Sequence, residues 1–226
     1  GNIRPHTYLL DALREFWGQG TLDGGLHRSE FGRRHFPSAP AQAMACYKSY
    51  FSAAVVYGPH PDDRAGEEFY HHPCRAMVVH WLKGGGEDPE DSLIWATGPL
   101  SFTDQVEWFM AKCTESLGRW EELHERSQTV LGMLDRTDAV FFRDNLLLQV
   151  GLHRSGCRGM LAFCRSCLAG RRGDYSSAFV LATEAMRHYD AGRQALSAAE
   201  HDRWRNFYRA DWLTNIGCTI YSLDTL

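Results

Sequence analysis

The stretch from Tyr57 to Pro73 carries more groups able to do chemistry than a connecting segment needs. Among its carboxylates, imidazoles and guanidinium, we select as candidate binding residues Arg64, Glu68, His71 and His72. Carboxylates and imidazoles hold metal ions or transfer protons, and a guanidinium binds carboxylates. We therefore interpret the stretch either as an interface or glycan-facing edge, or as a well-capped helix start. In the second case Asp62 and Asp63 cap the helix, and the positive end of the helix dipole stabilises their negative charges.

Metal chemistry is suggested by two Glu-x-x-His pairs, Glu68 with His71 and Glu121 with His124. Residues three apart share one side of a helix, and di-metal carboxylate bundles use two such pairs with single glutamates from two further helices. Such pairs also arise by chance in a chain rich in Glu and His, and Arg119–Arg126 is typical of a solvated face. A di-metal enzyme is thus the second alternative function, and we expect no metal or other cofactor.

A second polar cluster lies near the end of the chain and consists of Trp204, Arg205, Tyr208 and Asp211. Aromatic faces beside charged groups are typical of sugar sites, because rings stack on the C–H faces of a pyranose while charged groups bind its hydroxyls. The same residues also fit a final helix that closes a bundle with amphipathic aromatics and ion pairs. Both interpretations stay open, and the second is favoured.

Composition excludes several classes of protein. The net charge is −4 and the pI near 6.3, so nucleic acid is not an expected partner, and no apolar run approaches the roughly 20 residues that span a membrane. The seven cysteines are odd in number and irregularly spaced, which favours reduced thiols and a cytoplasmic setting. Cys164 and Cys167 form a C-x-x-C late in an expected helix, where core packing is favoured. Nucleophile-elbow and phosphate-loop motifs are missing, so we expect no activity in this domain alone.

Helical spacing of apolar residues extends over most of the chain. The expected shorter helices are Thr7–Trp17, Ser29–His35, Pro40–Val56 and Ala65–Leu82, and the expected long ones are Ser101–Leu134, Asp138–Leu168, Asp174–Leu196 and Ala199–Leu226. This pattern predicts an all-α fold, an antiparallel helical bundle of about four long helices plus shorter N-terminal helices. We expect a single domain over residues 1–226, with an N-terminal helical layer at 1–58 and the main bundle at 59–226.

Two features of the expected helices are unusual. Pro73 falls inside one of them, where it removes a backbone hydrogen bond. Gly151, Gly156 and Gly159 fall inside another, although each glycine costs a helix up to ~1 kcal/mol relative to alanine. We interpret these glycines as points where bulky side chains of neighbouring helices approach closely.

Three parts of the sequence, read together, resemble a known family. They are Asn2–Pro5 with Leu13–Trp17, then Glu30–Pro37 with Tyr47–Phe51, and finally Glu67–Pro73. They are similar to the helical region that follows the catalytic barrel in large bacterial glycoside hydrolases, most nearly the family 115 α-glucuronidases. Arg203-Trp204 is similar to a Lys-Trp pair in that family's closing helix. Pro73 lies one residue closer to Phe69-Tyr70 than in the family pattern, and this chain contains no barrel.

The resemblance implies a non-catalytic helical accessory domain of a carbohydrate-active protein, which packs on a barrel and shapes a glycan cleft or a dimer interface. Its partners would be the missing domain of the same polypeptide and a carbohydrate, and a homodimer stays open. No catalytic residue is carried over. The chain opens with Gly1-Asn2-Ile3 rather than Met, which we interpret as the mark of a piece excised from a longer protein. The first alternative is a free-standing helical protein-interaction module.

Overall fold

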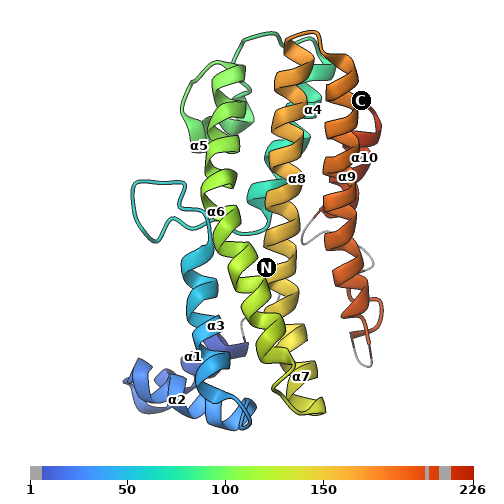
Figure 1. Ribbon diagram of the computed structural model, residues 1–226. Helices are drawn as coiled ribbons and strands as arrows, with labels where there is room; N and C mark the ends of the chain where they lie inside the picture. Colours follow the sequence, from blue (N-terminus) through green and yellow to red (C-terminus); the bar gives the residue numbers. More distant parts are fainter. Residues whose placement is uncertain (1–6, 202–203, 209–214) are drawn as a thin grey trace. The chain divides into compact units, whose positions relative to one another are not determined.

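The computed structural model describes residues 7–201, 204–208 and 215–226, and this part of the chain is all-α, without a strand (Figure 1). None of its helices is long and apolar enough to cross a membrane. The helices are α1 (Thr7–Gln19), α2 (Gly24–His35), α3 (Pro40–Ala53), α4 (Glu68–Leu82), α5 (Ile94–Thr97), α6 (Phe102–Leu131), α7 (Arg136–Phe142), α8 (Leu148–Arg171), α9 (Tyr175–Ala198) and α10 (Ile216–Asp224), with a 3-10 turn at Asp91–Leu93 and a π-helical stretch at Arg143–Leu147.

The chain divides into two compact units whose sequences interleave. The first unit comprises residues 1–53 and 119–151, and the second comprises residues 54–118 and 152–226. The N-terminal helical layer expected from the sequence therefore falls almost entirely in the first unit. That unit also takes in the second half of α6 and the whole of α7, which the sequence had assigned to the bundle.

The first unit is organised around buried aromatic side chains. Phe31, Phe36 and Phe142 are fully buried and Tyr47 nearly so. Phe36 meets Phe142 edge to face, with 5.5 Å between ring centroids. Aromatic rings of this size contribute most of the apolar area of a small core, which explains how a unit with short helices is held together.

In the second unit, α8 lies close to α4 and α9 because two of its glycines face tyrosine rings. A Cβ atom added at Gly156 would lie 2.8 Å from the ring of Tyr70, and one added at Gly159 would lie 2.8 Å from the ring of Tyr189. The Tyr189 hydroxyl donates a 2.8 Å hydrogen bond to the carbonyl of Tyr70. The prediction of close approach is thus confirmed for Gly156 and Gly159. The same prediction is wrong for Gly151, where an added Cβ atom would have no such neighbour within 4 Å.

The prediction of one continuous helix over Ala199–Leu226 is wrong. Residues 204–208 form turns, and α10 begins only at Ile216. Asn206 and Asn215 have positive φ angles of 61° and 54°. Asparagine adopts this left-handed conformation more readily than most residues, so it interrupts a helix that apolar spacing alone would continue. Within the described residues, the expected fourth long helix is therefore only the short α10.

Candidate functional site

A loop between α3 and α4 is closed on itself and brings Tyr57 and Arg64 to the start of α4. Val56 and Arg64 pair as an isolated antiparallel bridge, and the backbone N–H of Tyr57 donates to the carbonyl of Asp63 at 3.0 Å. The Asp63 carboxylate accepts a 3.0 Å hydrogen bond from the backbone N–H of His60. These bonds fix the loop without a regular strand.

Helix α4 begins without an aspartate cap. It starts at Glu68, and the preceding Glu67 makes no side-chain capping bond. The prediction that Asp62 and Asp63 cap this helix is therefore wrong. Asp63 stabilises the loop instead, and Asp62 is exposed to solvent several residues before the helix begins.

A pocket of about 380 Å³ lies between this loop and the first turns of α4. It lies entirely within the second unit, and we call it the α4 pocket. Besides Ala65, Gly66 and the buried Phe69, its lining consists of Tyr57, Arg64, Glu68, His72, Arg75 and Trp95. Three of the four residues selected from the Tyr57–Pro73 stretch thus line one concave surface, together with Tyr57, Arg75 and Trp95, which were not selected.

The aromatic part of the α4 pocket comes from Tyr57 and Trp95. Their rings meet edge to face with 5.3 Å between centroids, and Tyr57 lies almost parallel to Phe69 at 6.2 Å. Trp95 keeps 52% of its surface exposed. An exposed indole held against a second ring presents a firm apolar wall to a ligand.

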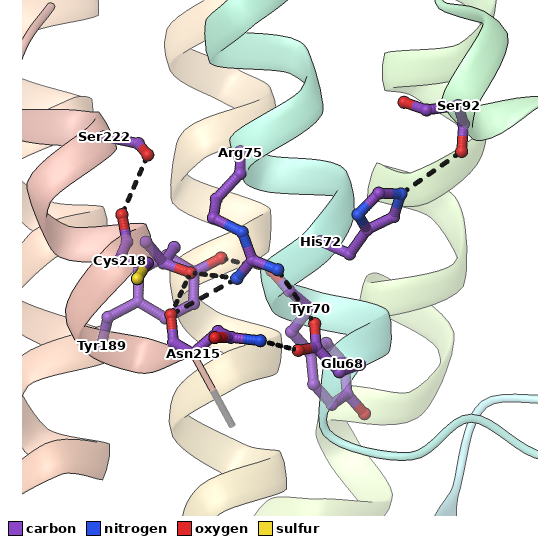
Figure 2. A network of polar contacts seen from close by, with 10 residues as sticks. Glu68, Tyr70, His72, Arg75, Ser92, Tyr189, Asn215, Cys218 and Ser222 are labelled. Carbon is purple, nitrogen blue, oxygen red and sulfur yellow. Dashed lines mark hydrogen bonds and ion pairs between the residues drawn. The ribbon is translucent and has the colours of Figure 1, made fainter. Parts of the chain in front are cut away.

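The polar part is a network centred on Arg75, shown in Figure 2. Arg75 donates from Nη2 to the Glu68 carboxylate at 3.2 Å and from Nη1 to the Thr219 hydroxyl at 3.1 Å and the Asn215 carbonyl at 3.3 Å. The Asn215 amide donates to the other oxygen of Glu68 at 2.5 Å. The network joins α4 to the start of α10, so both Glu68 and Arg75 are fixed before any ligand arrives.

The other two polar residues have looser surroundings. Arg64 is exposed at the rim of the pocket, and its Nη1 lies 3.5 Å from the carbonyl of Ala54, to which it donates. His72 is half-buried, and its Nε2 lies 3.4 Å from the carbonyl oxygen of Ser92 (Figure 2). Each of these side chains thus contacts a backbone carbonyl at the edge of the pocket.

His71 does not line the pocket, although it neighbours His72 in the sequence. It is buried against the ring of Tyr189, with 5.0 Å between centroids, and its Nδ1 has no hydrogen-bond partner. Burial, together with the smaller effects of the charges on Arg75 and His153, lowers the pKa of His71 to about 3. A neutral imidazole in this setting is a core residue, so the structure separates it from Arg64, Glu68 and His72.

The second cluster does not form one side of a helix. Trp204 is half-buried and meets Phe207 edge to face at 5.1 Å. Tyr208 is buried, and its backbone N–H donates to Glu200 at 2.5 Å. Arg205 is exposed. Asp211 lies outside the described residues, so the full set selected from the sequence is not seen together.

The metal candidates occupy different surroundings. Glu121 and His124 are half-buried on α6 in the first unit, whereas Glu68 and His71 belong to the second. Glu68 binds Arg75 and Asn215, whereas His71 is buried against Tyr189. In the ranges that the structure describes, no group of three His, Cys, Asp or Glu side chains is arranged to hold a metal ion.

Buried thiols account for the C-x-x-C pair. Cys164 and Cys167 are both buried inside α8 and are unpaired. Burial raises the pKa of the Cys167 thiol to about 12. A thiol rather than a thiolate is therefore present at neutral pH, as expected for core packing and unlike a redox pair.

Sequence reasoning missed three residues of the α4 pocket. Arg75 follows Glu68 by seven residues and could have been found, because that spacing returns to the same side of a helix. Tyr57 lies within the selected stretch, but nothing in its neighbours marks it as a pocket wall. Trp95 comes from a separate segment, and only the folded chain brings it to the pocket.

Comparison of the chain with protein-family models, with curated proteins and with solved structures found no match.

Proposed function

We propose that this chain is a non-catalytic helical accessory domain of a carbohydrate-active protein, and that the α4 pocket holds one acidic sugar residue. The observation that carries the proposal is that one pocket is lined both by the exposed ring of Trp95 and by the exposed guanidinium-bearing side chain of Arg64. The further partner in this proposal is the missing domain of the same polypeptide.

An aromatic wall suits the C–H face of a sugar ring. Trp95 is held edge to face by Tyr57, and half of its surface is open to the pocket side and solvent. A ring held in this way loses little conformational freedom when it is covered by a ligand. The pocket volume, about 380 Å³, is at the small end of ligand sites and suits one sugar residue better than a long chain.

The charges favour an acidic sugar. Arg64 and Arg75 both line the pocket, whereas Glu68 is the one carboxylate among its described lining residues. Glu68 is already bound by Arg75 and Asn215. We assign Arg64 to a ligand carboxylate because it is exposed at the pocket, and because guanidinium and carboxylate form charge-assisted, often bidentate hydrogen bonds.

The same geometry argues for binding rather than hydrolysis. Glycoside hydrolysis commonly needs two carboxylates on either side of the scissile bond, one of them able to donate a proton. The described lining of the α4 pocket offers Glu68 alone. Both of its oxygens already accept hydrogen bonds, one from Arg75 and the other from Asn215.

The proposal is tested by isothermal titration calorimetry with methyl glucuronoside and with methyl glucoside, which lacks the carboxylate. We expect the glucuronoside to bind and the glucoside to bind roughly 10-fold more weakly, because one charge-assisted hydrogen bond contributes about 1.5 kcal/mol or more. Arg64→Met should remove this difference between the two sugars.

A matched control is available on α1. Arg14→Met removes an exposed guanidinium from the first unit and should leave both affinities unchanged. Equal affinity of the two sugars for the unsubstituted protein, or a difference that survives Arg64→Met, would contradict the proposal.

A second candidate function is a helical protein-interaction module. It is favoured by a separate observation, the exposure of large apolar side chains along the first half of α9.

A further inference from the structure

An apolar groove of about 570 Å³ lies in the second unit, away from the α4 pocket lining. Its floor includes the buried residues Phe163 and Leu223, and its walls include Trp81 and Met186. The hydroxyl of Ser166 at this groove donates to the carbonyl of Ala178 at 2.7 Å. The polar groups of the floor are thus partnered internally, and the groove offers a mainly apolar surface.

One wall of the groove is the first half of α9, which carries unusually exposed aromatic residues. Tyr175 and Phe179 are 71% and 73% exposed, and both line the groove. They are four residues apart and so project from the same side of the helix. The run from Tyr175 to Thr183 contains no charged residue. Large exposed apolar patches mark interaction sites, and scarcity of charge is typical of the core of an interface.

We propose that this face binds a second copy of the same chain, with Phe179 of each copy entering the groove of the other. The reason is self-complementarity: the projecting ring and the hollow that can receive it belong to one face. An interface with two-fold symmetry uses the same patch on both copies. A patch that carries both parts meets this requirement without a different partner.

The exposed area is sufficient for a weak dimer. An aromatic side chain presents roughly 200 Å², so Tyr175 and Phe179, at 71% and 73% exposed, present roughly 300 Å² between them. Leu226 and Trp81 also line the groove and are 50% and 36% exposed, which brings the apolar area to roughly 450 Å² per copy. With a polar rim, this approaches the lower range of specific interfaces, about 600 to 800 Å² per partner.

The scarcity of charge on this face is compatible with self-association. Among the described lining residues of the groove, Asp224 is the one whose side chain carries a charge. A face with so few charges has little that would repel its own copy.

Sedimentation velocity over a range of protein concentrations tests this proposal. The unsubstituted chain should form a dimer with a dissociation constant on the order of 10 μM, as expected for an interface of this size. Phe179→Asp should leave a monomer at all concentrations. Trp17→Asp, which places the same charge on another exposed aromatic (79%) in α1, should leave the dimer unchanged.

A mixing experiment separates the projecting ring from the hollow. Phe179→Asp keeps the groove but loses the ring, whereas Ala182→Trp keeps the ring but fills the groove. Each variant alone should be monomeric, and their mixture, which keeps one of the two ring-in-groove contacts, should associate far more weakly than the wild type. Circular dichroism checks that both variants are folded. If Ala182→Trp does not fold, Thr183→Trp is used to fill the same groove instead. A monomeric wild type at about 100 μM, or variants that still dimerise alone, would overturn the proposal.

Discussion

The two faces of α4 use adjacent histidines in opposite ways. His72 lies half-buried at the α4 pocket beside the carbonyl of Ser92, whereas His71 is buried against Tyr189 with an unpartnered Nδ1. The pocket face carries charge and remains open to a ligand. The core face excludes charge and packs against rings. A single helix thus separates a binding surface from a stabilising one, and composition alone does not distinguish the two histidines.

The difference between the faces lies in their tolerance of change. On the core side, Tyr70 of α4 and Tyr189 of α9 contact glycines of α8 so closely that no space is left for a Cβ atom. On the pocket face, Trp95 and Arg64 border solvent. Substitutions on the core face should therefore reduce stability, and substitutions at the pocket should reduce binding.

The largest effect is expected at the glycines of α8. Gly159→Ala and Gly156→Ala should each lower the free energy of unfolding by about 3 kcal/mol, because a new Cβ overpacks a buried ring that cannot move freely. Gly151→Ala is the matched control in the same helix. It meets no neighbouring atom within 4 Å and should stabilise the protein by up to ~1 kcal/mol. Urea unfolding measures all three, and wild-type stability of Gly159→Ala would show that the close packing does not exist.

A smaller effect is expected from pH. His71 has a pKa near 6.5 when unfolded and about 3 when folded, so between these values the unfolded chain binds a proton that the folded chain does not. The stability contributed by neutral His71 is therefore complete above pH 6.5 and is lost as the pH falls toward 3, by about 1.4 kcal/mol per pH unit. Burial lowers the pKa of His153 as well, which adds to the loss.

The variant His71→Leu isolates this contribution. Its free energy of unfolding should depend less on pH between about 4 and 6, because one titrating group has been removed. Urea unfolding at several pH values provides the measurement. A slope identical to that of the wild type would mean that His71 is protonated in the folded state.

A local effect is expected from the loss of Arg75, which lines the α4 pocket and also binds the start of α10. Its side chain is 21% exposed and bonds Glu68, Asn215 and Thr219. Arg75→Met should weaken the docking of α10 by about 1 to 2 kcal/mol, because hydrogen bonds to a partly solvated charge are lost. Amide hydrogen exchange should accelerate in Ile216–Asp224. Arg193→Met removes an exposed ion pair with Asp190 on α9 and should have no such effect, and equal exchange in both variants would exclude the proposed role of the network.

The helices and part of the pocket could be predicted from the sequence because both depend on local spacing. Apolar periodicity located α1, α6, α9 and the continuous run of α7, the π-helical stretch and α8 to within a few residues, and the glycines of α8 indicated close packing. The break before α10 could not be found in this way, because it depends on the left-handed Asn206 and Asn215, and the carbonyl of Asn215 is held by Arg75 from another helix.

The same limit applies to the candidate site, of which only part could be predicted from local spacing. Arg64, Glu68 and His72 were accessible to sequence reasoning because they are close in sequence, whereas Trp95 reaches the pocket only through the fold. Whether each of the adjacent residues His71 and His72 is buried or lines the pocket depends on what packs against that side of α4. That information is held in Gly159 and Tyr189, far along the chain.

Calorimetric titration of Trp95→Ala with methyl glucuronoside tests most directly whether one face of α4 binds a ligand while the other stabilises the fold. We expect the affinity to fall roughly 10-fold, because the apolar wall for the sugar ring is lost. The free energy of unfolding should fall by about 2 kcal/mol or less, since half of this residue's surface is already exposed. Unchanged glucuronoside affinity in a folded Trp95→Ala protein would contradict the assignment of the α4 pocket as a sugar site.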